Sequence, residues 1–131
     1  MFVISTRNFP PELGGMQNLM GGLAEALINH GPVKVFADKT GDCEKFDKLS
    51  KVEIERFGGI KLFRKYRKAN RVTDYIKNNQ NIRSIFFDHW KSVEKVDFQS
   101  VKNIPAFCLI HSKEINHPTG SSINKRIINS I

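Results

Sequence analysis

The chain has 131 residues, 40% of them hydrophobic and 26% charged, and its ten phenylalanines are enough to fill the core of one domain. It contains neither a signal-peptide pattern nor an apolar run of the roughly 20 residues that a membrane-spanning helix needs. Its two cysteines, Cys43 and Cys108, do not make a disulfide framework, and no Cys/His spacing predicts a zinc site. We therefore expect a reduced, cytoplasmic protein without a bound metal.

The net charge of +8 has one main source. Residues 61–77 carry seven cations and one anion, whereas the rest of the chain is nearly balanced. The basicity is therefore a local feature and not a general nucleic-acid-binding composition.

The first quarter of the chain predicts a strand, a loop and a helix. Residues 2–4 are apolar and predict a buried strand, which a loop with Pro10-Pro11 and Gly14-Gly15 follows. Apolar residues then recur at helical spacing up to a stop at Gly31-Pro32, namely Met16, Leu19, Met20, Leu23 and Leu27. Gly21-Gly22 lowers helix propensity, so we expect close packing of this helix on a sheet.

Two further strands are predicted before the basic segment. Residues 33–37 predict the second strand, and the polar segment 39–50 predicts a loop. Residues 52–57 alternate between apolar and polar side chains, as a strand with one face in water does.

The second half begins with a predicted helix over residues 61–78, which we call the basic helix. Residues 82–88 predict a strand, and 91–103 predict an irregular connection. Residues 104–110 form the most apolar strand, which we expect at the centre of the sheet, and a last helix begins near Ser121 or Ser122. The inner stripe of the basic helix is predicted to be Leu62, Tyr66, Ala69, Thr73 and Ile76.

Strands that alternate with helices predict an α/β fold with a Rossmann-like, mainly parallel sheet flanked by helices. The apolar residues of the last helix (Ile123, Ile127, Ile128, Ile131) reach the last position, so we expect a further strand and regard residues 1–131 as one truncated domain. An exposed apolar edge of this kind could also drive formation of a homodimer.

Ligands of parallel α/β sheets bind beyond the carboxyl ends of the strands. Gly14-Gly15 opens a helix there, where free backbone N–H groups can bind phosphate, although a tight turn without a ligand is the simpler explanation. Asp88-His89-Trp90 could form a strand exit with an aromatic lid. His111 could donate a hydrogen bond or transfer a proton, or be satisfied by the backbone. The other polar residues after the strands are Ser5, Thr6, Arg7, Asn8, Asp38, Ser112, Lys113 and Glu114.

The basic helix has three possible roles. It could rest on anionic lipid or bind nucleic acid, but a solvated lysine-rich face without a ligand is the simplest interpretation. The cations along its predicted outer side are Lys61, Arg64, Lys65, Lys68 and Arg71.

Two motifs resemble a known enzyme family. Phe9-Pro-Pro-Glu-Leu-Gly-Gly-Met-Gln17, followed by Leu23-Ala-Glu-Ala-Leu27, His30-Gly31 and Val33-Lys-Val-Phe-Ala37, resembles the start of GT-B glycosyltransferases of the retaining family 4, also called group 1. His111-Ser-Lys-Glu114 resembles the family's His-Gly-x-Glu after a central strand, with serine where glycine is usual. The resemblance covers essentially the whole chain in order.

The resemblance implies the N-terminal, acceptor-side domain of a two-domain enzyme, without the C-terminal domain that binds the sugar nucleotide. Gly14 and Gly15 would approach the donor diphosphate, and His111 would be the catalytic residue near the transferred sugar. The acceptor-side or sugar-side candidates would be Arg7, Asn8, Gln17, His89 and Glu114.

The family transfers sugar with retention and without a metal or cofactor, and the helix dipole and basic groups stabilise the leaving diphosphate. The implied partners are a nucleotide-sugar donor and a glycan or lipid-linked acceptor, with peripheral contact between the basic helix and an anionic inner membrane face. The fragment alone would be inactive.

Two other classes stay open at this point. One is a dinucleotide-binding Rossmann protein, in which Asp38 would bind the ribose, although the glycine pattern differs from the usual fingerprint. The other is a non-enzymatic basic module, for which we expect no specific nucleic-acid binding because no recognised motif accompanies the basic helix.

Overall fold

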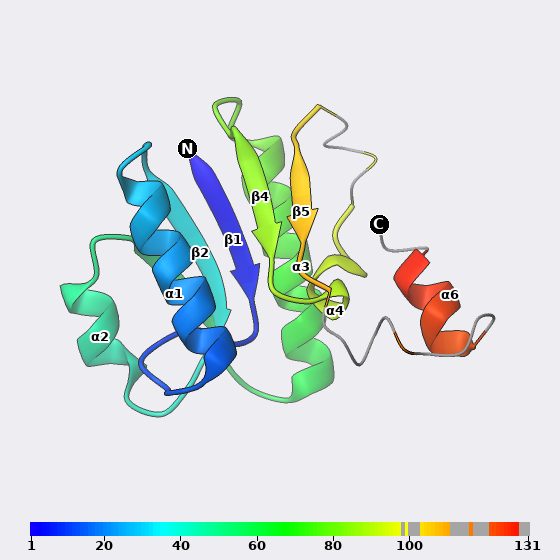
Figure 1. Ribbon diagram of the computed structural model, residues 1–131, viewed down its shortest axis with the longest axis horizontal. Coiled ribbons are helices and arrows are strands. Elements are labelled where there is room, and N and C mark those ends of the chain that lie inside the picture. The colour runs from blue at the N-terminus through cyan, green and yellow to red at the C-terminus, as the bar shows by residue number, and fades with distance from the viewer. Residues whose placement is uncertain (98, 100–102, 111–115, 117–120, 129–131) are drawn as a thin grey trace.

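The computed structural model describes residues 1–97, 99, 103–110, 116 and 121–128, and it contains a five-stranded sheet with helices on both faces (Figure 1). All four strand pairs are parallel and the order is β3-β2-β1-β4-β5, which confirms the predicted Rossmann-like α/β fold. The strands are β1 (Phe2–Thr6), β2 (Val33–Asp38), β3 (Glu53–Phe57), β4 (Ser84–Phe87) and β5 (Ala106–Cys108). The described helices are α1 (Gly15–Ile28), α2 (Cys43–Leu49), α3 (Lys61–Lys77), α4 (Trp90–Val93) and α6 (Ser122–Ile128).

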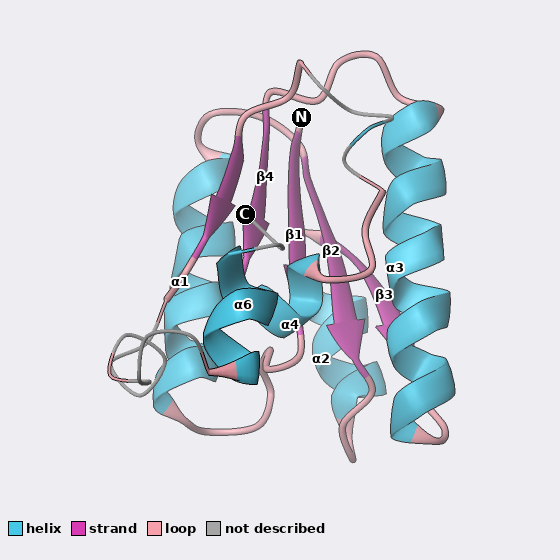
Figure 2. Ribbon diagram, turned by 90° about the vertical axis from the view of Figure 1, so that its right-hand side faces the viewer, coloured by secondary structure: helices cyan, strands magenta, loops and turns pink. Residues whose placement is uncertain are grey.

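The sheet separates two apolar layers. Alternate residues of a strand point to opposite faces, so Phe2 and Ile4 pack on the α1 side with Met20, whereas Val3 packs on the α3 side with Val72. Figure 2 shows α1 and α3 on opposite sides of the sheet. Because helices cover both faces, all five residues of β1 are buried, which explains its unbroken apolar run.

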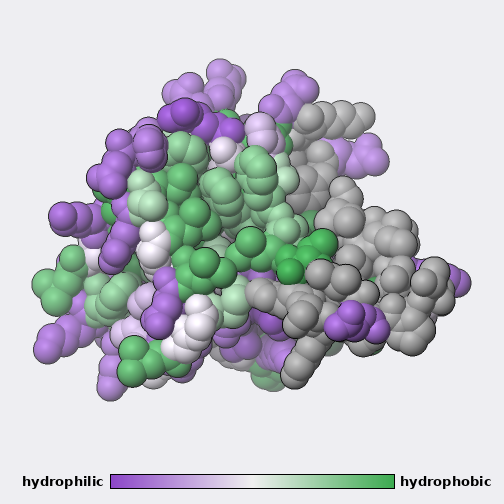
Figure 3. Space-filling model, viewed as in Figure 1, coloured by the Kyte–Doolittle hydropathy of each residue, from purple (hydrophilic) through white to green (hydrophobic). Residues whose placement is uncertain are grey.

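The prediction that residues 104–110 form the central strand is wrong. β5 pairs with β4 alone among the described residues, and β1 is the central strand. Phe107 is 52% exposed and stacks on Phe86, with ring centroids 5.2 Å apart. The space-filling view shows hydrophobic residues exposed on this face of the sheet (Figure 3). The apolar composition of this strand therefore did not predict its position in the sheet. The strand order places β4 next to β1 and β5 beyond β4, at the edge of the described sheet.

The predicted loop over residues 39–50 is also wrong, since it contains α2. This short helix is polar except for a few residues that face the core. Cys43 is 1% exposed, and three residues later Phe46 packs edge-on against Phe9, with ring centroids 6.3 Å apart. These two tertiary contacts stabilise a helix that the composition of the segment does not favour.

The close approach expected at Gly21-Gly22 occurs at one glycine and not against the sheet. A Cβ atom on Gly21 would lie 2.8 Å from Cγ of Pro10, in the loop before α1. A Cβ atom on Gly22 would have no neighbour within 4 Å. Gly21 therefore lets α1 pack on its own preceding loop.

The inner stripe of α3 begins later than predicted. Leu62 and Tyr66 are 60% and 44% exposed, whereas Ala69, Thr73 and Ile76 are buried. Figure 2 shows the first turns of α3 extending past the carboxyl ends of the strands, so no sheet lies beneath them. The end of α3 that carries Leu62 thus forms one wall of a space beyond the sheet.

Residues 91–103, predicted as irregular, include the single turn of α4 within their described part. α6 confirms the last predicted helix. None of the described helices combines the length and the apolar character needed to cross a bilayer. The side chains of Ile127, Ile128 and Ile131, on which the homodimer prediction depends, lie outside the described side chains.

Candidate anion site at the carboxyl edge of the sheet

Asp88 organises the carboxyl edge, where it follows β4 next to the end of β1. Its side chain is fully buried. One carboxylate oxygen accepts hydrogen bonds from the Thr6 hydroxyl (2.9 Å) and from the backbone N–H of Arg7 (2.8 Å). The other accepts from the Ser92 hydroxyl of α4 at 2.7 Å. Charge-assisted hydrogen bonds of this kind are stronger than neutral ones, so Asp88 fixes where the chain leaves β1 and where α4 begins.

Lys68 lies beside this network and is the most deeply buried cation of α3. It is 4% exposed, and its ammonium group donates to Oδ1 of Asp38 and to the backbone oxygen of Thr6, both at 2.6 Å. Arg64, one turn earlier, binds Oδ2 of Asp38 at 3.1 Å. The prediction that Lys68 belongs to the exposed cationic side of the helix is wrong, because the carboxylate at the end of β2 draws it inward.

Burial lowers the pKa of Lys68, because it removes the ammonium group from water. The charge and the hydrogen bond of Asp38 oppose this effect, and the nearby charge of Arg7 adds to it. Lys68 and Arg64 each bind one oxygen of Asp38, so the carboxylate expected to bind a ribose in the dinucleotide-binding alternative takes part in two ion pairs within the fold. That alternative stays a prediction.

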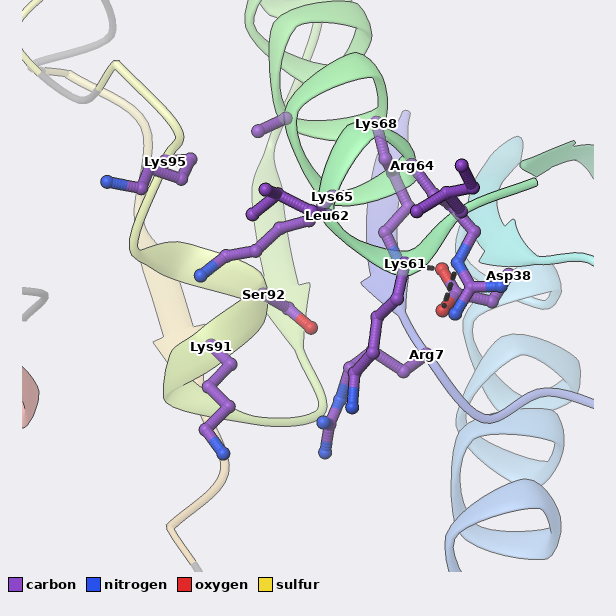
Figure 4. Close-up of a pocket in the computed structure, with 12 residues that line it drawn as sticks. Arg7, Asp38, Lys61, Leu62, Arg64, Lys65, Lys68, Lys91, Ser92 and Lys95 are labelled. Carbon is purple, nitrogen blue, oxygen red and sulfur yellow. Dashed lines mark hydrogen bonds and ion pairs between the residues drawn. The ribbon is translucent and has the colours of Figure 1, made fainter. Parts of the chain in front are cut away.

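A cavity of about 460 Å³ opens between α3 and α4 beyond the ends of β1 and β2. This volume lies in the usual range for small-molecule sites. Apolar atoms of Ile60, Leu62 and Ala69 form part of the wall, and Ser92 and Asp38 contribute oxygen atoms. The remaining lining residues are seven cations: Arg7, Lys61, Arg64, Lys65, Lys68, Lys91 and Lys95 (Figure 4).

Three of these cations have carboxylate partners. Arg64 and Lys68 bind Asp38, and Lys65 binds Glu94. Burial raises the pKa of Glu94, but hydrogen bonds from Lys65 and from Arg126 of α6 outweigh that effect, so the net shift is downward. The Asp38 and Glu94 carboxylates therefore compensate only part of the positive charge around the cavity.

The other four cations make no ion pair within the described part of the chain: Arg7, Lys61, Lys91 and Lys95. Lys91 and Lys95 lie over the rings of Trp90 and Tyr66, at 5.3 and 5.4 Å from the centroids. The Nε atom of Arg7 is buried without a hydrogen-bond partner among the described residues. A buried N–H of this kind costs about 1–3 kcal/mol unless an acceptor reaches it.

Comparison with protein-family models and with curated proteins found no match. Within the described part of the chain, no three His, Cys, Asp or Glu side chains come close enough together to hold a metal ion.

The Gly14-Gly15 pair lies at the same edge of the sheet, at the start of α1 on the opposite face. The first turn of α1 has no acidic residue and no side-chain cap. Gly15 is exposed, and a Cβ atom there would have no neighbour within 4 Å, whereas one on Gly14 would meet the Gln17 side chain. Gly15 is thus open to solvent, and Gln17 is the polar side chain next to Gly14.

The remaining candidates have mixed outcomes. The backbone N–H of Asn8 donates to the Thr6 hydroxyl at 3.0 Å, so Asn8 is part of the turn that positions Arg7. His89 caps α4, because its Nδ1 accepts the N–H of Lys91 at 3.0 Å. Trp90 is 2% exposed and is part of the core, not a lid. His111 and Glu114 lie outside the described residues.

The basic helix carries less free charge than its sequence suggests. Besides the pairs made by Arg64, Lys65 and Lys68, Arg71 binds Glu55 at 2.9 Å and Lys77 binds Asp97 at 3.3 Å. The excess positive charge instead gathers at the cavity, to which Lys91 and Lys95 add. Sequence reasoning missed these two, which follow the predicted strand over residues 82–88 in the segment that was predicted to be irregular.

Proposed function

We propose that this chain is the acceptor-side domain of a GT-B glycosyltransferase that moves a sugar from a nucleotide-sugar donor to a glycan or lipid-linked acceptor, with retention and without a metal. The observation that carries the proposal is the joint position of two features at one sheet edge. An accessible Gly14-Gly15 turn begins α1 on one face, and a cavity rich in uncompensated cations lies on the other.

The chemistry of sugar transfer makes this pairing useful. Departure of a nucleoside diphosphate leaves negative charge that the N–H groups at the start of a helix can stabilise without reorganisation. In an enzyme without a metal, these groups do the work that a divalent cation would otherwise do. Gly14 and Gly15 would face the donor diphosphate, and the cavity would receive the acceptor.

His111 is the proposed catalytic residue, next to the transferred sugar, and Arg7, Asn8, Gln17, His89 and Glu114 are proposed on the acceptor or sugar side. Asn8 and His89 would act by positioning, since Asn8 bonds Thr6 and His89 bonds the backbone of α4. We further propose a cytoplasmic enzyme that contacts an anionic membrane surface through the exposed part of the basic helix around Lys61.

A transfer assay on the protein encoded by the complete gene tests the proposal. Radiolabelled nucleotide sugars would be incubated with lipid and glycan extracts of the host cell, with EDTA present. We expect incorporation of label that His111→Ala and Gly15→Asp both reduce at least about a hundredfold, because the former removes the catalytic side chain and the latter places a carboxylate where a diphosphate binds.

The control is Gly41→Asp, which places the same charge on a loop where a Cβ atom has no neighbour within 4 Å. It should leave transfer unchanged. Absence of transfer from every nucleotide sugar, or equal loss in the Gly41 variant, would contradict the proposal.

A further inference from the structure

The cavity between α3 and α4 is lined by many cationic side chains, although apolar atoms form most of its surface. Seven cations and a single carboxylate line it, and that carboxylate is already bound by Lys68 and Arg64. Four of the cations make no ion pair within the described part of the chain. Gathering like charges around one cavity is unfavourable unless an anion offsets their repulsion.

Arg7 is the residue that points to a specific acceptor. Its backbone is fixed by Asp88, and its Nε atom is buried yet lacks a hydrogen-bond partner among the described residues. Figure 4 shows the side chains of Arg7, Lys61 and Lys91 extending toward the same side of the cavity. Guanidinium groups bind phosphate through two parallel N–H bonds, and lysines add charge around it.

The floor of the cavity is rigid. Lys68 is held by Asp38 and by the Thr6 carbonyl, and Ser92 is held by Asp88. A rigid floor places a bound group at one depth without an ordering cost. The rim is different, because Ile60 and Leu62, which line the cavity at the start of α3, are 72% and 60% exposed. The site therefore suits an anionic group attached to a less polar remainder.

We propose that this cavity binds a phosphate monoester or diphosphate group, with Arg7, Lys61 and Lys91 as its ligands and Lys68 as the fixed charge beneath it. The proposal that the cavity binds phosphate depends only on the residues of the cavity. The further step, that this phosphate is part of the sugar acceptor, rests on the proposed function and implies that the enzyme uses acceptors that carry a phosphate. The phosphate could come from a lipid headgroup or from a soluble ester, since both offer the same chemistry.

The test is a titration of the ¹⁵N-labelled chain with inorganic phosphate and with pyrophosphate, at constant ionic strength held with chloride. We expect saturable shifts of the backbone amides of Arg7, Lys61 and Lys91. Arg7→Gln and Lys91→Gln should each weaken binding about ten- to a hundredfold, because each removes a charge-assisted contact. Arg7→Lys should recover part of the loss, since it restores the charge without the bidentate geometry.

Lys48→Gln is the matched control, because it removes an exposed cation on α2, away from the cavity. It should change binding less than twofold. Shifts that do not saturate, that spread over all basic residues, or that respond equally to the Lys48 substitution would overturn the proposal.

A second arm distinguishes the sources of phosphate. Vesicles of phosphatidylcholine with phosphatidic acid would be compared with vesicles of equal surface charge made with phosphatidylglycerol, which lacks a phosphate monoester. Stronger binding to phosphatidic acid that soluble phosphate competes away and Arg7→Gln abolishes identifies a lipid source. Phosphate binding in solution with no preference between the vesicles identifies a soluble ester, and vesicle binding unaffected by Arg7→Gln, without phosphate binding, would overturn the site.

Because this titration needs no sugar transfer, its failure and the failure of the proposed function are separate results. Sugar transfer without phosphate binding would support the proposed glycosyltransferase function and overturn the phosphate site. Phosphate binding without sugar transfer would support the phosphate site and contradict the proposed function.

Discussion

The buried pair of Lys68 and Asp38 gives the sharpest test of how the carboxyl edge is held together. Asp38→Asn would leave the Lys68 ammonium group, whose side chain is 5% exposed, without an ion pair, and the Thr6 carbonyl would still accept a hydrogen bond from it. Removing one partner of a buried ion pair costs about 3–5 kcal/mol, and we expect about 3 because the amide oxygen can still accept a hydrogen bond. Lys68→Met should cost about 2–3 kcal/mol, since Asp38 retains Arg64.

The pair is isolated by the double variant. If the two side chains stabilise each other, Asp38→Asn with Lys68→Met should cost less than the sum of the single changes, by about 2 kcal/mol. Urea unfolding followed by fluorescence measures this directly, because the chain has one tryptophan, Trp90, and it is 2% exposed.

The dependence on pH adds a second readout. In Asp38→Asn, the pKa of Lys68 falls further below its ordinary value, whereas the unfolded chain keeps the ordinary one. Between these two values the unfolded state binds more protons, so the stability of the variant should rise with pH relative to the double variant, which lacks the amine. Additive costs, or a single cost for Asp38→Asn below about 1 kcal/mol, would refute the buried ion pair.

Three more outcomes are expected from unfolding measurements. Asp88→Ala should cost at least about 3 kcal/mol, because three donors lose their acceptor; a cost under 1 kcal/mol would contradict the buried network. Gly21→Ala should destabilise, because its Cβ would meet Pro10 at 2.8 Å, whereas Gly22→Ala should stabilise by about 0.5–1 kcal/mol, and the opposite order would contradict the packing described for α1. The pKa of Glu94 is lower in the folded chain than in the unfolded chain. The ionised carboxylate therefore adds to the free energy of unfolding at a pH above the ordinary pKa of glutamate, and this contribution is lost as the pH falls through the lowered pKa. Glu94→Gln should therefore cost stability at pH 7 and match the unsubstituted chain in acid, and a constant difference would exclude this linkage.

The parts of the fold that the sequence predicted correctly are those with a strong local pattern. The apolar β1, the helical spacing of α1 and its Gly31-Pro32 stop need no knowledge of the partner elements. α2 and the position of β5 depend on contacts far apart in the sequence. The contact of Phe46 with Phe9 and the outward course of the chain after β4 have no local signature.

The candidate site divides in the same way. Its general location followed from a rule about parallel sheets, and Arg7 was correctly expected at the carboxyl edge. The sequence could not predict which cations of α3 are paired and which are free. The spacing of residues along a helix does not reveal that the end of β2 places Asp38 against Lys68. Which cations are neutralised depends on contacts between elements far apart in the sequence. Counting charges along the chain therefore overestimated the free positive charge of the basic helix and missed the cations that gather at the cavity.

The Nε–H of Arg7 offers the most direct test of the central claim, that the cations at the carboxyl edge form a site for a phosphate group. Its ¹H–¹⁵N resonance can be followed in the labelled chain while phosphate is added. We predict that the signal moves in step with saturation of the Lys61 and Lys91 amides, because the guanidinium group that carries this N–H lines the cavity and binds the phosphate. A signal that does not move at phosphate concentrations that saturate those amides would contradict the account.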